Sequence, residues 1–209
     1  MNVAKIINSL PGSEDARYLE VGVFKGATFN EVRCADKHGV DPWPEAPSTH
    51  HVFSDEFFRK LPVAEKYDFI YIDGLHEFTQ VVRDYEHARE HLSSSGLLFM
   101  HDLVPVNAAY AVPEYCGDVY RLLHVLVTNY LPKGYESIWA LVDAENDAGL
   151  TMLRCPPSLR PYFADDLDPE WVKLTPTVSY EEFKSSISDL KRVTVDQMTA
   201  LAQVYWSLR

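Results

Sequence analysis

One stretch of the sequence constrains the fold more than any other. Residues 68–73 are apolar, β-branched and aromatic and end at Asp73-Gly74, a pattern typical of a buried strand. From His76 to Leu92 the apolar residues recur with helical spacing, and a second apolar run follows at Leu97–Met100. Two strands joined through a helix need a crossover connection, so we expect them to be parallel members of one sheet.

The same alternation of strand and helix extends through the first part of the chain. Further strands are expected at residues 17–22, 38–41 and 51–54, helices at 3–10, 28–33, 55–61 and 118–130, and a hairpin at 137–142 and 149–153. This order predicts an α/β fold, doubly wound, with a mostly parallel sheet that has helices on both faces. Phe53 falls inside an expected strand and is predicted to be a core residue.

The sequence changes character at Pro156-Pro157, where an acidic stretch begins. Two capping boxes follow, Ser179 with Glu182 and Thr194 with Gln197, and each predicts the start of a helix. We therefore expect residues 1–155 to form one domain. Residues 156–209 are expected to be a helical extension that packs on this domain, forms a lid or supports a homodimer.

Composition and charge exclude several classes of partner. With 19 Lys+Arg against 31 Asp+Glu the net charge is −12, which argues against binding to a phosphate backbone. The apolar runs are much shorter than the roughly 20 residues that a membrane helix needs, and the N-terminus does not resemble a signal peptide. The 3 cysteines are widely spaced and form no CxxC pair. We expect a cytoplasmic protein with neither nucleic acid nor membrane as a partner.

Carboxylates stand at the ends of the expected strands. In an open parallel sheet, ligands bind beyond the carboxyl ends of the strands. The acids at these ends are Glu20, Asp41, Asp55, Asp73 and Asp102. A cleft with so many carboxylates is poorly suited to a phosphate group.

A glycine loop follows the first expected strand. Gly22 and Gly26 follow Glu20 by two and six residues, and Asp41 lies 19 residues beyond Gly22. A nicotinamide-binding fold also has an acid at that position, but its G-x-G-x-x-G fingerprint needs a glycine where this chain has Phe24. S-adenosylmethionine (SAM) carries an ammonium, a sulfonium and no phosphate. The loop therefore favours SAM over NAD.

The chain resembles the class I SAM-dependent methyltransferases, and among them the group that includes the macrocin O-methyltransferase-like enzymes. The similarity runs from about residue 17 to residue 155 and rests on blocks in the family's order, namely residues 18–26, 39–42, 54–58, 68–76, 96–102 and 117–120. It implies a Rossmann-like fold with a seven-stranded sheet that ends in a C-terminal hairpin strand.

The resemblance also implies which residues bind SAM. Glu20, Gly22 and Gly26 would line the methionine moiety, and Asp41 would bind the ribose hydroxyls. Ser54 and Asp55 would lie beside the adenine, and Asp73 would lie near the methyl group.

In the metal-dependent sugar methyltransferases of this group, an acid matching Asp73 and an acid pair after the fifth strand hold Mg²⁺, and a histidine matching His76 deprotonates the acceptor. Here the pair reads His101-Asp102, so an imidazole replaces one acid. Mg²⁺ prefers oxygen ligands, whereas a set with histidine suits Mn²⁺, Fe²⁺ or Zn²⁺. We expect a divalent metal, Mg²⁺ or Mn²⁺, at Asp73, His101 and Asp102. The usual pKa of histidine, near 6.5, would suit His76 as a general base at neutral pH.

The expected function is O-methylation of a small molecule, such as a sugar or a natural product, with His76 and Asp73 as catalytic residues. Tyr110 and Tyr115 lie in the expected loop after the strand at Leu97–Met100, where they could form a wall for the acceptor. Transfer to nitrogen or carbon remains open. So does a protein that kept the fold for binding or scaffolding and lost catalysis, whereas an NAD-dependent enzyme is disfavoured by the missing glycine.

Overall fold

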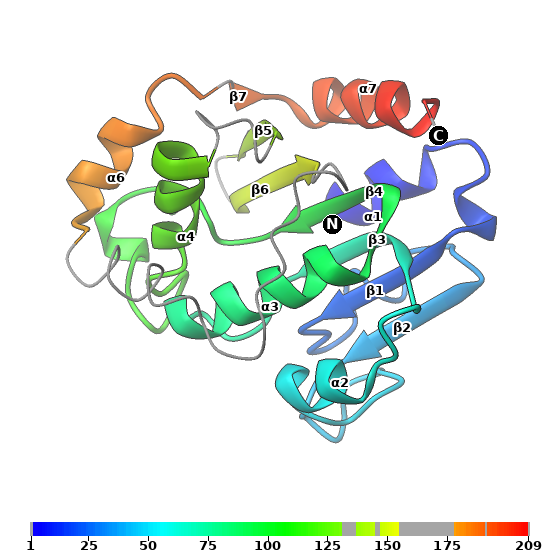
Figure 1. Ribbon diagram of the computed structural model, residues 1–209. Coiled ribbons are helices and arrows are strands. Elements are labelled where there is room, and N and C mark those ends of the chain that lie inside the picture. The colour runs from blue at the N-terminus through cyan, green and yellow to red at the C-terminus, as the bar shows by residue number, and fades with distance from the viewer. Residues whose placement is uncertain (1, 131–136, 145–146, 155–177, 191, 209) are drawn as a thin grey trace.

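The computed structural model describes residues 2–130, 137–144, 147–154, 178–190 and 192–208. Its sheet has the order β2-β1-β3-β4-β6-β5-β7 (Figure 1). Strands β1 (Arg17–Val21), β2 (Asp36–Val40), β3 (Tyr67–Ile72) and β4 (Leu92–Met100) are parallel. β6 (Asp147–Arg154) is antiparallel to β4 and to β5 (Ser137–Ala144), and β7 (Arg192–Val193) is parallel to β5. The predicted α/β, Rossmann-like class is confirmed.

Helices cover both faces of the sheet. Along β3, Phe69 and Tyr71 belong to the core on one face, and Ile70 and Ile72 to the core on the other. The first face is covered by α1 (Asn2–Asn8) and α7 (Val195–Trp206) (Figure 1). The second is covered by α2 (Ser54–Lys60), α3 (Phe78–His91), α4 (Tyr120–Val125) and α6 (Tyr180–Ser186). Burial on both faces explains why the central strands are apolar without alternation.

The described C-terminal residues contact the sheet domain. Both predicted capping boxes form, at the starts of α6 and α7. Trp206 is buried, with its ring centroid 4.5 Å from that of Phe69, and its Nε1 donates a hydrogen bond to the Pro11 carbonyl at 2.8 Å. The expected boundary between residues 155 and 156 lies outside the described residues.

Two expected elements are wrong. Residues 51–54 form no strand, because only a single bridge between Val40 and His50 continues the sheet beyond β2 and α2 already begins at Ser54. Phe53 is consequently not in the core; it is 70% exposed.

Residues 28–33 form turns instead of the expected helix. Side chains from elsewhere bond the Phe29 carbonyl and the Arg33 N–H, the pair that would close a turn of this helix. Asn8 bonds the Glu31 carbonyl and the Arg33 N–H, and the Lys37 ammonium donates to the carbonyls of Phe29 and Val32.

Three short helical turns complete the described elements. They are the 3₁₀ turns η1 (Ser13–Asp15) and η2 (Ala108–Tyr110) and the π-helical turn η3 (Leu126–Tyr130), which extends α4. The predicted helix at residues 118–130 is therefore α4 followed by η3. Among the described helices, none has the length and apolar character needed to cross a membrane.

Candidate functional site

A cavity of about 640 Å³ lies beyond the carboxyl ends of β1, β2 and β3. Most of the residues expected to bind a cofactor line it, namely Glu20, Gly22, Asp41, Ser54, Asp55 and Asp73, and His76 lines it as well. Gly26 does not. Its φ of +77° and the Pro47 Cγ, which would lie 2.3 Å from an added Cβ, make Gly26 a residue of a tight turn between the lining residues Lys25 and Ala27.

The glycine loop is held in a conformation that few residues allow. Gly22 has a φ of +88°, and an added Cβ would lie 2.0 Å from the carbonyl oxygen of Asp73. Phe24 has a φ of +48°, and its N–H donates to Asp41 Oδ2 at 2.7 Å. Asp41 Oδ1 accepts from the Trp43 N–H at 2.8 Å. The Asp41 carboxylate therefore fixes two loops at the cavity, in addition to lining it.

Glu20 lies deep in the wall of the cavity. It is 2% exposed and accepts a hydrogen bond from the Tyr18 hydroxyl. Burial raises the pKa of Glu20 to about 8. The side chain is therefore largely protonated near neutral pH. The sequence-based expectation of a negative charge at this position is wrong. A cationic ligand beside Glu20 would favour its ionised form.

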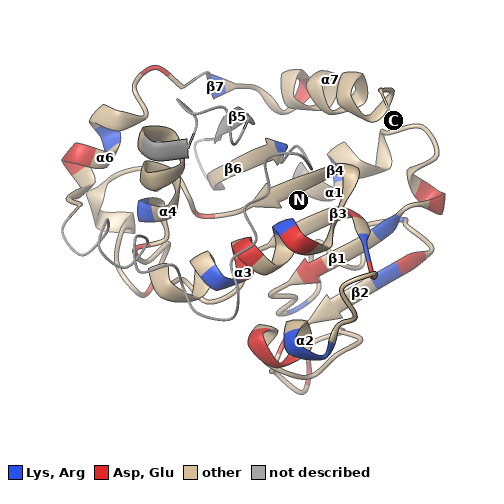
Figure 2. Ribbon diagram, in the orientation of Figure 1, with Lys and Arg blue, Asp and Glu red and all other residues tan. Residues whose placement is uncertain are grey.

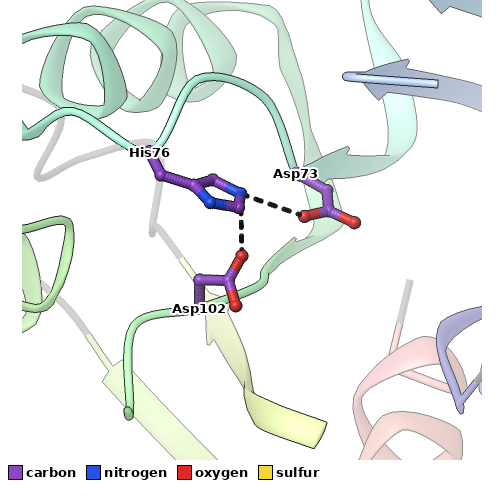
Figure 3. A group of neighbouring side chains, drawn as sticks. All are labelled: Asp73, His76 and Asp102. Carbon is purple, nitrogen blue, oxygen red and sulfur yellow. Dashed lines mark ion pairs between the residues drawn. The ribbon is translucent and has the colours of Figure 1, made fainter. Parts of the chain in front are cut away.

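An acid–imidazole cluster, formed by Asp73, His76, His101 and Asp102, stands where β3 and β4 end. His76 Nε2 lies 2.8 Å from Asp102 Oδ2 and 4.0 Å from Asp73 Oδ1 (Figure 3). One ligand atom from each of Asp73, His76 and Asp102 can lie within 4.8 Å of the others. Asp102 has a φ of +61°, a left-handed conformation that is rare outside glycine and recurs at functional sites.

His101 also reaches this cluster. Its Nδ1 lies 3.4 Å from Asp73 Oδ1 and 3.3 Å from Asp102 Oδ1. The structure thus brings together Asp73, His101 and Asp102, the residues expected to hold a metal, and adds His76 to them. Of these four side chains, the three whose ligand atoms all lie close enough to share one ion are Asp73, His76 and Asp102. Two carboxylates with an imidazole are a donor set that fits a divalent transition metal, and Mn²⁺ more readily than Mg²⁺.

The charges in the cluster stabilise each other. Hydrogen bonds to Asp102 and Asp73 raise the pKa of His76 to about 10. Burial alone would raise the pKa of Asp73 and of Asp102, but hydrogen bonds from His101 and His76 lower both below the usual range. The expectation that His76 titrates near neutrality is therefore wrong, because two carboxylates hold its proton.

The loop after β4 positions His76. The Nδ1 of His76 is hydrogen-bonded to the carbonyl oxygen of Tyr115, so Nδ1 carries a hydrogen and Nε2 faces the acids. Gly117 packs so closely that an added Cβ would lie 1.8 Å from the His76 carbonyl oxygen. The rings of Tyr110 and Tyr115 lie 5.0 Å apart and are both exposed.

Two cavity residues on α3, Gln80 and Asp84, are not among the residues expected from the sequence. Gln80 and Asp84 line the cavity with Ser54 and Asp55, and these four residues are called the α2–α3 corner below. Asp84 is 1% exposed, and burial raises its pKa to about 6. A signal was present in the sequence, because Asp84 falls within the apolar stripe of this helix, next to Tyr85.

Comparisons with known proteins agree with this geometry. Residues 19–103 match a family model described as a methyltransferase domain. No curated protein matches the chain. One similar solved structure is a candidate O-methyltransferase from Klebsiella pneumoniae, which is 13% identical with a TM-score of 0.56 over 74% of this chain and 80% of that one.

Two further structures contain ligands. TomG from Streptomyces achromogenes, an O-methyltransferase of tomaymycin synthesis in complex with SAM, is 13% identical with a TM-score of 0.53 over 74% of this chain and 78% of its own. An O-methyltransferase from Bacillus cereus in complex with S-adenosylhomocysteine (SAH) is 11% identical with a TM-score of 0.52 over 74% and 79%. At these identities the likeness establishes a shared fold. The expected fold is confirmed by these structures, and the match of residues 19–103 agrees with the expected methyltransferase domain.

Proposed function

We propose that this chain, in which residues 19–103 match a methyltransferase domain, is an enzyme that transfers a methyl group from SAM to a hydroxyl oxygen of a small molecule. The observation that carries the proposal is the cavity beyond the strand ends, because it extends from the glycine loop to Asp73 and His76 of the acid–imidazole cluster. One part of the site can thus bind a donor while the other receives a proton.

SAM, as the methyl donor, supplies a reactive methyl carbon bound to a positively charged sulfur. In the proposal Glu20 and Gly22 contact its methionine part, Asp41 its ribose, Ser54 and Asp55 its adenine, and Asp73 lies near the methyl group. Gly26 shapes the loop through its left-handed conformation. The carboxylates that line the cavity suit a ligand that carries positive charge and no phosphate.

The acceptor would bind at His76, beside the exposed rings of Tyr110 and Tyr115. Its hydroxyl proton would pass to His76 Nε2, the nitrogen that faces the cluster. A bond would form between the acceptor oxygen and the methyl carbon as the bond from that carbon to sulfur breaks, which leaves SAH and the methyl ether. The main contribution of the protein to the rate would be to align the two substrates.

As a base, His76 must first lose the proton that Asp102 and Asp73 stabilise. We propose that a divalent cation held by Asp73, His101 and Asp102 would supply the positive charge that these carboxylates otherwise take from the His76 proton. His76 Nε2 could bind the cation or accept a proton, but not both at once. The ligand set with His101 therefore leaves His76 free as the base.

A small molecule fits the charge of the protein better than a nucleic acid does. The net charge is −12, and in the described elements Lys and Arg are scattered among Asp and Glu (Figure 2). A polyanion would meet repulsion from this surface.

We further propose that residues 1–155 and 156–209 belong to one folding unit with a seven-stranded sheet completed by the β5–β6 hairpin and β7. The burial of Trp206 against Phe69 supports this organisation. A single cooperative melting transition is expected for the whole chain, and two separate transitions would contradict it.

The activity is tested by incubating the purified chain with SAM, Mn²⁺ and a panel of phenols, sugars and amines, and by measuring SAH release. Turnover with hydroxyl acceptors is the expected result. Turnover with amines alone would replace O-transfer by N-transfer. Tight binding of SAM without turnover on any acceptor would favour the scaffolding alternative.

A further inference from the structure

The α2–α3 corner holds more hydrogen-bond acceptors than donors. Gln80 Nε2 lies 3.1 Å from Ser54 Oγ, 3.1 Å from Asp55 Oδ1 and 3.0 Å from Asp84 Oδ1. An amide nitrogen has two hydrogens, so one of these three acceptors is left without a full hydrogen bond from it. The carbonyl oxygen of the same amide is itself occupied by Arg83.

The two carboxylates of the corner differ in burial. Asp55 has a side chain that is 51% exposed and an additional partner in Arg83, whose Nε lies 3.3 Å away. Asp84 is 1% exposed and still lines the cavity. Its pKa, raised to about 6 by burial, stays below neutral pH, so the buried group is mostly ionised there.

A buried carboxylate is stable only if its oxygens are well hydrogen-bonded. A carboxylate accepts about four hydrogen bonds, and Asp84 receives side-chain bonds from Gln80 and Ser54. Since the remaining capacity is all acceptor, the ligand group that fits here is a donor. A carbonyl oxygen at the same place would face the charged oxygens of Asp84 and would be repelled.

We infer that Asp84, held in place by Gln80 and Ser54, selects the adenine of the cofactor by accepting a hydrogen bond from its exocyclic amino group. The inference rests on the proposed function, because it takes SAM as the ligand. It assigns the discrimination between amino and oxo purines to the buried carboxylate of α3 rather than to the exposed Asp55 of α2.

The experiment is a calorimetric titration with SAH and with S-inosylhomocysteine, in which an oxo group replaces the adenine amino group. The wild-type chain is expected to bind SAH about 10–100-fold more tightly, the usual cost of leaving a buried acceptor unpaired. Asp84→Asn presents an N–H to the purine and should remove most of this preference. Asp55→Asn is the matched variant: it alters a second proposed contact to the adenine, so it should weaken binding of both ligands by a similar factor and keep the preference. Thermal melting checks that both variants are folded.

The outcomes separate the inference from the proposed function. If the wild-type chain binds neither ligand, the proposed function fails, and the inference fails with it. If the wild-type chain binds SAH but binds S-inosylhomocysteine equally well, only the inference is overturned, and this result requires no variant. Loss of the preference in Asp55→Asn but not in Asp84→Asn would also overturn it, because the discrimination would then lie on α2.

Discussion

Asp73 and His76 of the acid–imidazole cluster line the same cavity as the α2–α3 corner, but the charges of the two groups are balanced in different ways. In the cluster the two carboxylates are paired with His76 and His101 of the same chain, at 2.8 to 4.0 Å. In the corner Asp55 and Asp84 share a single amide, and the guanidinium of Arg83 forms an ion pair with the exposed Asp55. The cluster, whose carboxylates and imidazoles can share a proton, is suited to proton transfer. The corner, which has a surplus of hydrogen-bond acceptors, is suited to recognition of a ligand that donates hydrogen bonds.

The largest effect should come from removing the imidazole. For His76→Ala we expect kcat to fall by about 10²–10⁴-fold, the usual contribution of a general base. SAH affinity should change little, because the proposed donor contacts lie elsewhere. The measurement is SAH release in the steady state, together with calorimetric titration.

His87→Ala is the matched control for this variant, because His87 lies on α3 and stacks on Phe58 at 5.0 Å, outside the cavity lining. Its kcat should stay near that of the wild-type chain. Unchanged turnover in His76→Ala would show that the chemistry does not depend on this imidazole, and it would contradict the assignment of proton transfer to the cluster.

The second prediction concerns the glycine that lets the loop after β1 pass the end of β3. Gly22→Ala should lower the free energy of unfolding by about 3–5 kcal/mol, because the new Cβ meets backbone at a positive φ. Gly74→Ala is the control, since its nearest neighbour would be Val21 Cγ1 at an ordinary 3.6 Å. Urea denaturation checks both variants, and equal stabilities would contradict the close approach.

The third prediction separates cation binding from recognition. Asp102→Asn removes a charged ligand from the cluster and should weaken Mn²⁺ binding by at least about 10-fold. SAH affinity measured without metal should be nearly unchanged. The exposed Asp189→Asn provides the control. Equal Mn²⁺ affinity in both variants, measured by titration, would remove the cluster as the cation site.

The last prediction concerns the pH dependence of stability at Glu20, which belongs to neither group and whose effect within any single pH unit is small. Its pKa is raised from 4.5 to about 8 in the folded chain, so between these values the folded state binds more protons than the unfolded state. Its contribution therefore lowers the unfolding free energy as pH rises, by up to about 1.4 kcal/mol per pH unit. Glu20→Gln should flatten the unfolding free energy against pH, whereas the exposed Glu14→Gln should not. A parallel loss in both variants would argue against a protonated Glu20.

The comparison also explains what sequence reasoning could and could not find. Strand-end residues such as Asp41 and Asp73 were found because the carboxyl ends of parallel strands meet at one edge. Asp84 was missed because helical periodicity assigns such a position to the core, and only the packing of α3 against α2 brings it to the cavity. The pKa of His76 depends on its distance from Asp102, 26 residues away in the sequence, and so could not be derived from residue type.

Sequence patterns predicted an element correctly where the interactions that form it lie within a few residues. The capping boxes at Ser179 and Thr194 formed as predicted because each lies within one helical turn. The expected helix at residues 28–33 did not form, because Asn8 bonds the Arg33 N–H and Lys37 bonds the Phe29 carbonyl. Both side chains lie outside the segment, so its own sequence could not indicate them.

The most direct test of the account is a calorimetric titration of the wild-type chain with SAH, in the presence and absence of Mn²⁺. We expect one SAH site per chain with a dissociation constant in the micromolar range, and a separate Mn²⁺ site whose affinity is at least about 10-fold lower in Asp102→Asn. No binding of SAH up to millimolar concentration, with or without Mn²⁺, would contradict the claim that this cavity is a SAM site.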